Sequence, residues 1–192
     1  MGSPKQLLRL GDETLIRRAV RTALASRCAR VFVVVGAAAA AVSRDVDDLP
    51  VETVVNASWA NGMATSIRAG IEAVAAAEPR LDAALLILAD QPAITVDILD
   101  RIVAAGEDAA AGLVACEYAG TLGAPALYAR RHFDALCRLR GDRGGKALLE
   151  AHRDTVVRIP FAPAAVDVDT REDYRRLRLT SPPPPRRARD RG

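Results

Sequence analysis

Asp90 is the acidic residue whose place in the sequence most favours chemistry. It directly follows the apolar run 83–89. A carboxylate at the end of a buried run must be solvated, paired or bound to a metal ion, because an unpaired buried charge is very costly. The alternative is that Asp90 caps the next helix, but Thr95 with Asp97 fits that cap better. We therefore expect Asp90 to hold a ligand or a metal ion.

A second acidic segment lies near the C-terminal end of the chain, where Asp167 and Asp169 flank a valine. In an extended strand both carboxylates point to the same face, because side chains alternate. Carboxylates from two separate loops, together with triphosphate oxygens, suit Mg²⁺. The alternative is that Thr170 and Asp173 form a helix-capping box, which needs no ligand.

The loop 56–66 joins a predicted strand to a predicted helix and contains the chain's single tryptophan. Gly62 lets the backbone approach a ligand closely, and Ser66 offers a hydroxyl in the first turns of the helix. The alternative is a capped helix whose loop places Trp59 in the core.

Two further segments carry a lysine beside turn-forming residues. Lys5 follows a Gly-Ser-Pro turn, and its mobile charge suits phosphate, although a lysine near a terminus is usually just solvated. The glycine-rich run 141–145 precedes Lys146 and a predicted helix, whose N-terminus can receive an anion. This run lacks the spacing of a P-loop, so a solvent loop is the alternative.

These residues are positioned by strands and helices that alternate along the chain. Apolar runs predict strands at 31–36, 51–55, 83–89, 113–115, 125–128 and 156–160. Helical periodicity predicts helices at 12–25, 62–77, 95–105, 131–139, 145–152 and 170–178. Such alternation indicates an α/β sheet with right-handed crossovers. Because ligands lie beyond the carboxyl ends of the strands in such sheets, Gly36 and Asp90 are expected on the ligand-facing edge.

The composition of the 192 residues is that of one cytoplasmic globular domain, which we place at 1–178. The net charge of +3 comes from the tail, since removing its four arginines and one aspartate leaves 23 basic and 23 acidic residues. A neutral body argues against nucleic acid as a partner. No apolar run is long enough for a membrane span, and no signal peptide is visible. The Pro/Arg-rich tail 179–192 is expected to be disordered.

The cysteines and histidines predict neither a zinc site nor a disulfide framework. Three cysteines are widely spaced and form no Cys-x-x-Cys pair. His132 and His152 lie inside predicted helices without a partner at ligand spacing, so both are interpreted as structural.

Six segments together resemble the MobA-like nucleotidyltransferases, and most closely the molybdenum cofactor cytidylyltransferases. They are Met-Gly-Ser-Pro-Lys-Gln-Leu-Leu at 1–8, Asn-Gly-Met-Ala-Thr-Ser-Ile-Arg-Ala-Gly at 61–70, Leu-Ala-Asp-Gln-Pro at 88–92, Gly-Ala-Pro at 123–125, Gly-Asp-Arg-Gly-Gly at 141–145 and Val-Asp-Val-Asp-Thr-Arg-Glu-Asp at 166–173. Each segment alone is modest, but the set is specific in this order and spacing.

The resemblance implies a Rossmann-like three-layer α/β/α fold with a mostly parallel sheet. It also implies transfer of a nucleoside monophosphate from an NTP to a phosphate acceptor, with release of pyrophosphate and with Mg²⁺ as cofactor. In the closest subfamily the NTP is CTP and the acceptor is molybdopterin. A molybdoenzyme is then an expected recipient of the product.

The resemblance also implies roles for individual residues. The expected catalytic residues are Lys5, Asp90 and Asp169, of which the two aspartates bind the metal. The expected nucleotide-binding residues are Lys5, Asn61, Gly62, Ser66 and Asp90. The expected acceptor-binding residues are Gly123, Pro125, Asp142 and Lys146.

Members of the family begin with an apolar strand and a Leu-Ala-Ala-Gly type loop before the Met-Gly with which this sequence starts. We therefore expect a sheet without its first strand. This departure leaves open a non-catalytic chaperone that delivers cofactor to a molybdoenzyme. A small oxidoreductase on the same fold is a further alternative, although the Gly-x-Gly-x-x-Gly fingerprint of nicotinamide binding is absent.

Overall fold

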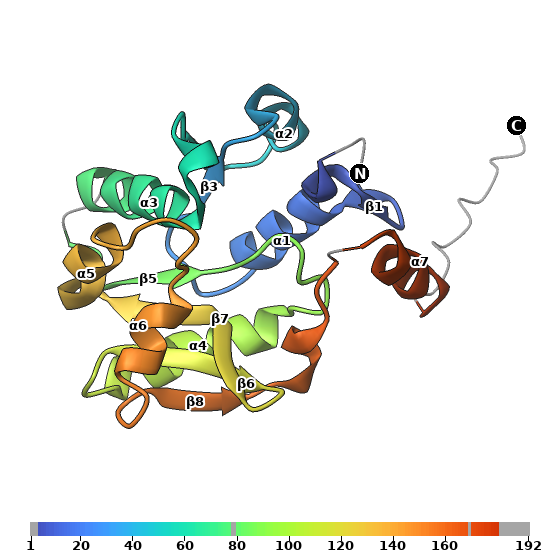
Figure 1. Ribbon diagram of the computed structural model, residues 1–192. Coiled ribbons are helices and arrows are strands. Elements are labelled where there is room, and N and C mark those ends of the chain that lie inside the picture. The colour runs from blue at the N-terminus through green and yellow to red at the C-terminus, as the bar shows by residue number, and fades with distance from the viewer. Residues whose placement is uncertain (1–3, 78–79, 169, 181–192) are drawn as a thin grey trace, which may run out of the picture.

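The computed structural model describes residues 4–77, 80–168 and 170–180 (Figure 1). Its largest sheet has the strand order β5-β7-β6-β8, from β5 (Ala83–Leu86), β6 (Leu113–Tyr118), β7 (Thr121–Ala129) and β8 (Val157–Pro160). A parallel pair, β3 (Phe32–Val35) and β4 (Glu52–Val55), forms a separate sheet. Within the described part of the chain no strand joins the two sheets by hydrogen bonds.

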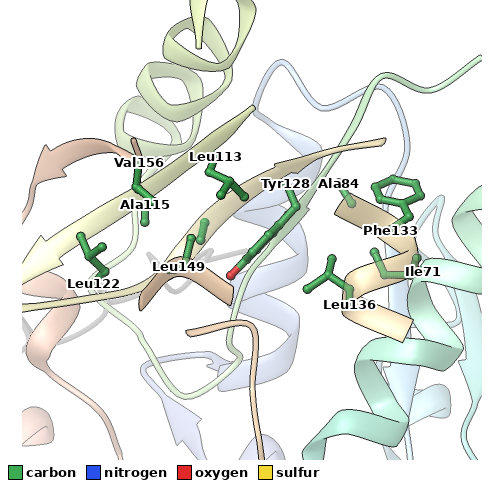
Figure 2. Packing of buried hydrophobic residues seen from close by; sticks show 11 residues of the cluster. Ile71, Ala84, Leu113, Ala115, Leu122, Tyr128, Phe133, Leu136, Leu149 and Val156 are labelled. Carbon is green, nitrogen blue, oxygen red and sulfur yellow. The ribbon is translucent and has the colours of Figure 1, made fainter. Parts of the chain in front are cut away.

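Helices cover both faces of the four-stranded sheet, because the side chains of β6 alternate between two cores. Leu113 and Ala115 pack in a core with α3 (Met63–Ala77), α5 (Phe133–Cys137) and α6 (Lys146–Ala151). Figure 2 shows Tyr128 near the middle of this core. Val114 and Cys116 face the opposite core, with α4 (Val96–Asp108). The result is the three-layer α/β arrangement that the sequence predicts.

The β3–β4 pair has a core of its own. Val33 and Val35 pack with Ile16 and Val20 of α1 (Leu15–Leu24) and with Val42 of α2 (Ala39–Asp45). The helix α2 has no counterpart among the predicted helices, because its alanine-rich sequence carries little apolar periodicity.

The sheet is mixed rather than mostly parallel. β7 runs antiparallel to both β5 and β6, whereas β6 and β8 are parallel. The reversal is a tight hairpin turn in which Ala119 and Gly120 both have positive φ angles, 48° and 73°. Two residues of this conformation match the twist of a hairpin. The sequence did not predict this turn, because its first residue is an alanine, whereas hairpin turns are usually indicated by Asn-Gly or Asp-Gly.

The two ends of the described chain meet. A short hairpin of β1 (Arg9–Leu10) and β2 (Glu13–Thr14) packs against α7 (Arg171–Thr180) through a cluster that contains Leu10, Leu15 and Val168. The Tyr174 hydroxyl donates to the carbonyl of Arg9 at 2.6 Å. The segment before α7 is thereby held beside the N-terminal residues (Figure 1).

Among the described residues, no helix is long and apolar enough to cross a membrane.

Candidate active site

Lys5 and Asp90 form an ion pair, with 2.5 Å between Nζ and Oδ2. Lys5 begins the short 3-10 helix η1 (Lys5–Leu7), and Asp90 lies in the turn beyond β5, whose regular pairing ends at Leu86 rather than at residue 89. The Asp90 side chain is only 16% exposed and that of Lys5 is 34% exposed. Lys5 and Asp90 are therefore in contact although they lie far apart in the sequence. The contact gives the Asp90 charge a partner.

The backbone around the second acidic segment is fixed directly to Asp90. The Val168 N–H donates to the Asp90 carbonyl at 3.0 Å. Asp167 is partly buried in the same stretch, and its charge raises the pKa of Tyr118, although burial raises that pKa more. Asp169 lies outside the described residues, so its predicted role as a metal ligand stays a prediction. The capping box of Thr170 and Asp173 is present, with the Asp173 N–H donating to Thr170 Oγ1 at 3.1 Å.

A buried asparagine organises the loop between β4 and α3. The Asn56 amide donates to Thr65 Oγ1 at 2.9 Å and to Ser66 Oγ at 3.0 Å, and its carbonyl accepts from the Ser58 N–H at 2.9 Å. Ser66, predicted to border the nucleotide, is thus oriented by Asn56, whereas Asn61 is exposed. Sequence reasoning missed Asn56, although it follows an apolar strand as Asp90 does.

Gly62 and Asp142, predicted for two different substrates, lie side by side. Gly62 has φ of 102°, and a Cβ atom there would stand 2.4 Å from the Gly141 carbonyl oxygen and 2.8 Å from Asp142 Oδ1. The Ala64 N–H donates to the Gly141 carbonyl at 3.0 Å. Only a glycine lets the 141–145 loop dock so closely on the start of α3.

The rest of that loop reaches the end of β5. A Cβ atom on Gly145 would stand 2.4 Å from Tyr128 Oη and 3.4 Å from Leu86 Cδ1. Lys146 begins α6 and is exposed. The loop therefore carries an available cation at the edge of the sheet where β5 ends.

Gly123 and Pro125 are both buried in β7. A Cβ atom on Gly123 would stand 2.2 Å from Tyr118 Oη, and the bond from Ala124 to Pro125 is cis. Packing against Tyr118 thus explains the glycine at position 123. The predicted contact of Gly123 and Pro125 with the phosphate acceptor stays a prediction.

Trp59 is not a core residue, since 49% of it is exposed. It stands over Gly36, where a Cβ atom would lie 2.5 Å from Trp59 Cβ. Gly36 follows β3 directly and forms an isolated bridge with Ala38, so it lies at the strand's carboxyl end, as predicted.

One apolar cluster sets several of these residues on a common edge. Leu7, Val35 and Ala89 pack in the same core, and they neighbour η1, Gly36 and Asp90 in the sequence. The predicted edge at the strand ends therefore gathers a lysine, a carboxylate and two loops, an arrangement suited to binding a polyanion together with a cation.

The donor atoms fit a hard divalent cation. Within residues 4–77, 80–168 and 170–180, no three His, Cys, Asp or Glu side chains form a cluster of their own. Mg²⁺ is commonly held by only one or two carboxylates plus substrate phosphates. Asp90, with hard oxygen donors and partial exposure, suits that mode, and thiolate or imidazole ligands are not needed.

A profile of the MobA-like NTP transferase domain matches residues 1–156. The chain belongs to the MobA-like NTP transferase family. Its fold and family are those of nucleotidyltransferases that act on nucleoside triphosphates.

The chain is similar over most of its length to two proteins with different names. Nicotine blue oxidoreductase of Paenarthrobacter nicotinovorans is 31% identical over 185 residues, which cover 91% of this chain and 87% of that protein. Rv0371c of Mycobacterium tuberculosis H37Rv, solved in complex with manganese, is 32% identical with a TM-score of 0.79, and the match covers 93% of this chain and 94% of that one. A divalent metal is therefore bound by a homologue.

A more distant structure shows the shared fold alone. Molybdopterin-guanine dinucleotide biosynthesis protein A of Archaeoglobus fulgidus is 17% identical with a TM-score of 0.69. That match covers 93% of this chain and 90% of the archaeal chain.

Proposed function

We propose that this MobA-like protein transfers CMP from CTP to a molybdopterin-type phosphate acceptor and releases pyrophosphate. The observation that carries the proposal is the Lys5–Asp90 pair at the strand ends, with the backbone of Val168 hydrogen-bonded to Asp90. Family membership supports the NTP as substrate. The choice of CTP and of molybdopterin rests on the resemblance of the six sequence segments.

The reaction needs positioning and charge neutralisation more than covalent catalysis. An acceptor phosphate oxygen forms a bond to the α-phosphorus of the NTP, while the bond from that phosphorus to the oxygen bridging to the β-phosphate breaks. Lys5 is a point charge that can follow the triphosphate as negative charge shifts to the departing pyrophosphate. No proton has to be removed from an ionised acceptor phosphate.

Asp90 is proposed to hold the divalent cation, with Asp169 as the expected second ligand. When bound, Mg²⁺ or Mn²⁺ supplies positive charge to the phosphate oxygens. The Lys5 ammonium pairs with the Asp90 carboxylate at 2.5 Å, so the Asp90 charge is not buried alone. The lysine and the cation would then share one carboxylate, from which both could reach the triphosphate.

The two loops at the start of α3 are proposed to receive the rest of the substrates. Asn61, Gly62 and Ser66 border the base and ribose on this hypothesis. Asp142 and Lys146 then face the acceptor, together with Gly123 and Pro125 behind them. The contact of Gly62 with Asp142 supports adjoining subsites, because one loop packs on the other.

The test is pyrophosphate release from CTP, GTP and ATP in the presence of Mg²⁺ and molybdopterin. The proposal expects release with CTP that depends on both the metal and the acceptor. NTP binding without release would contradict it and favour the cofactor-delivering chaperone. Release with GTP alone would correct the base assignment and leave the transferase in place.

A redox function is the second candidate, favoured by one observation, the 31% identity to a protein named nicotine blue oxidoreductase. Its test is the oxidation of NADH or NADPH, followed by absorbance, with a quinonoid dye as the electron acceptor. Oxidation of NADH or NADPH, with no pyrophosphate released from any NTP, would contradict the transferase proposal and favour the redox function.

A further inference from the structure

Segment 161–168, which carries Asp167, is fixed at three points, one at the end of β6 and two in the turn beyond β5. The Phe161 N–H donates to the Glu117 carbonyl at 3.0 Å at the end of β6. The Val168 N–H donates to the Asp90 carbonyl at 3.0 Å. Between them, the Gln91 amide nitrogen donates to the Ala164 carbonyl at 2.9 Å. Of these three, only the bond from Gln91 comes from a side chain.

Gln91 is far more buried than a glutamine usually is, with 3% of its surface exposed. Its Oε1 atom is buried and has no hydrogen-bond partner among the described residues. The Gln91 amide also lies beside Tyr118, whose hydroxyl packs on Gly123. A buried amide that leaves one of its polar atoms unsatisfied is costly, so packing alone does not explain it.

We propose that Gln91 is a positioning residue that holds segment 161–168, which carries Asp167, against Asp90 at the proposed site of the divalent cation. The inference rests on the proposed metal site. In this proposal Gln91 acts through its amide nitrogen, which donates to the Ala164 carbonyl, and not as a ligand of the cation. Its effect is to fix the distance between the turn at Asp90 and segment 161–168, which lie far apart in the sequence.

Removal of such a supporting hydrogen bond typically weakens metal affinity by about 10-fold to 100-fold. The Gln91→Met variant keeps the length and volume of the side chain but loses the donor to Ala164. We expect its Mn²⁺ dissociation constant to rise by about 10-fold. The loss of turnover should be recovered at saturating Mn²⁺, which a purely structural defect would not allow.

The experiment measures Mn²⁺ binding by electron paramagnetic resonance on the full chain with CTP present, against a protein-free Mn²⁺ and CTP reference, for wild type, Gln91→Met, Gln91→Glu and Asp90→Asn. Asp97→Asn, on the exposed first turn of α4, is the matched control and should bind Mn²⁺ as wild type does. Gln91→Glu also lacks the donor, so it serves if the methionine variant does not fold.

The outcomes distinguish the role of Gln91 from the proposed metal-dependent transferase function. Wild-type binding that Asp90→Asn abolishes and the Gln91 variants weaken, with recovery of turnover at high Mn²⁺, supports both. Binding lost in Asp90→Asn but unchanged in a folded Gln91 variant overturns the role of Gln91 alone. A wild-type chain that binds no Mn²⁺ overturns the metal site and this inference together.

Discussion

At the scale of single residues, the ion pair of Lys5 with Asp90 carries the proposed chemistry. Sequence position identified Asp90, because a carboxylate after an apolar strand needs a partner. Position alone could not identify Lys5, since a lysine near a terminus is usually solvated, and only the resemblance to the family singled it out. The structure supplies the physical reason, a 2.5 Å contact that no local pattern encodes.

Lys5→Met should reduce kcat/KM for pyrophosphate release by about 100-fold to 1,000-fold, the usual loss when one charge-stabilising donor is removed. The fold should persist, because the Lys5 side chain is one-third exposed. The measurement is a coupled pyrophosphate assay, with Arg138→Met on the exposed surface as the control. Unchanged kcat/KM in Lys5→Met would remove the lysine from the mechanism.

Cys116 provides a residue-scale test of the core. Burial raises the pKa of its thiol from 9.0 to about 11. A raised pKa favours the neutral thiol in the folded state, so this contribution to stability is complete below pH 9 and is lost as the pH rises through about 11. At pH 8 iodoacetamide should leave Cys116 unmodified in the folded protein and modify it in urea, as mass spectrometry would show. Rapid labelling of folded protein at pH 8 would contradict its burial.

At the scale of elements, the sequence predicted the strands that are apolar throughout and the helices with a clear apolar stripe. It placed the cap of α4 correctly, since Thr95 accepts from the Ile98 N–H. It extended the strand before Asp90 too far, because Ile87 and Ala89 are apolar for packing reasons whereas Leu88 is exposed. None of these three residues pairs with a strand in the described part of the chain. It also missed that loops 56–66 and 141–145 dock on each other, since that contact depends on tertiary packing.

The docking of those loops predicts an unequal effect of two glycine substitutions. Gly62 and Gly120 both have positive φ, but a Cβ atom at Gly62 would clash with Gly141, and Gly120 has nothing within 4 Å. Gly62→Ala should therefore raise the KM for NTP several-fold and lower the unfolding temperature more than Gly120→Ala does. Steady-state kinetics and thermal melts of the pair measure this difference. Equal effects would mean that the loop contact is unimportant.

At the scale of the whole molecule, two cores lie on the two faces of one sheet, and the smaller β3–β4 unit packs beside them. The core of the smaller unit reaches the edge at the strand ends, because Leu7, Val35 and Ala89 pack in it close to Lys5, Gly36 and Asp90 in the sequence. The alternation of strands and helices predicted the α/β sheet, and the resemblance to the family implied its three layers; the ligand-facing edge stays a prediction. The mixed strand order could not be predicted, because a strand's direction is set by the turn that precedes it, and the turn at Ala119 carries no strong signal.

Leu113→Ala should destabilise the molecule by about 2–5 kcal/mol, because the side chain is fully buried in the core of Figure 2 and its removal leaves a cavity. Val55→Ala is the control, since Val55 is 64% exposed, and it should change stability by less than about 0.5 kcal/mol. Urea unfolding followed by circular dichroism gives both values. A Leu113→Ala loss no larger than that of Val55→Ala would contradict the arrangement of the core.

The most direct measurement of the central claim is pyrophosphate release by Asp90→Asn with CTP, Mg²⁺ and molybdopterin. The substitution removes the negative charge with almost no change in volume, and the partly exposed side chain lies outside the apolar cores. The account predicts turnover below detection together with a wild-type circular dichroism spectrum. Wild-type turnover by the folded variant would contradict a cation held at Asp90, and with it the proposed mechanism.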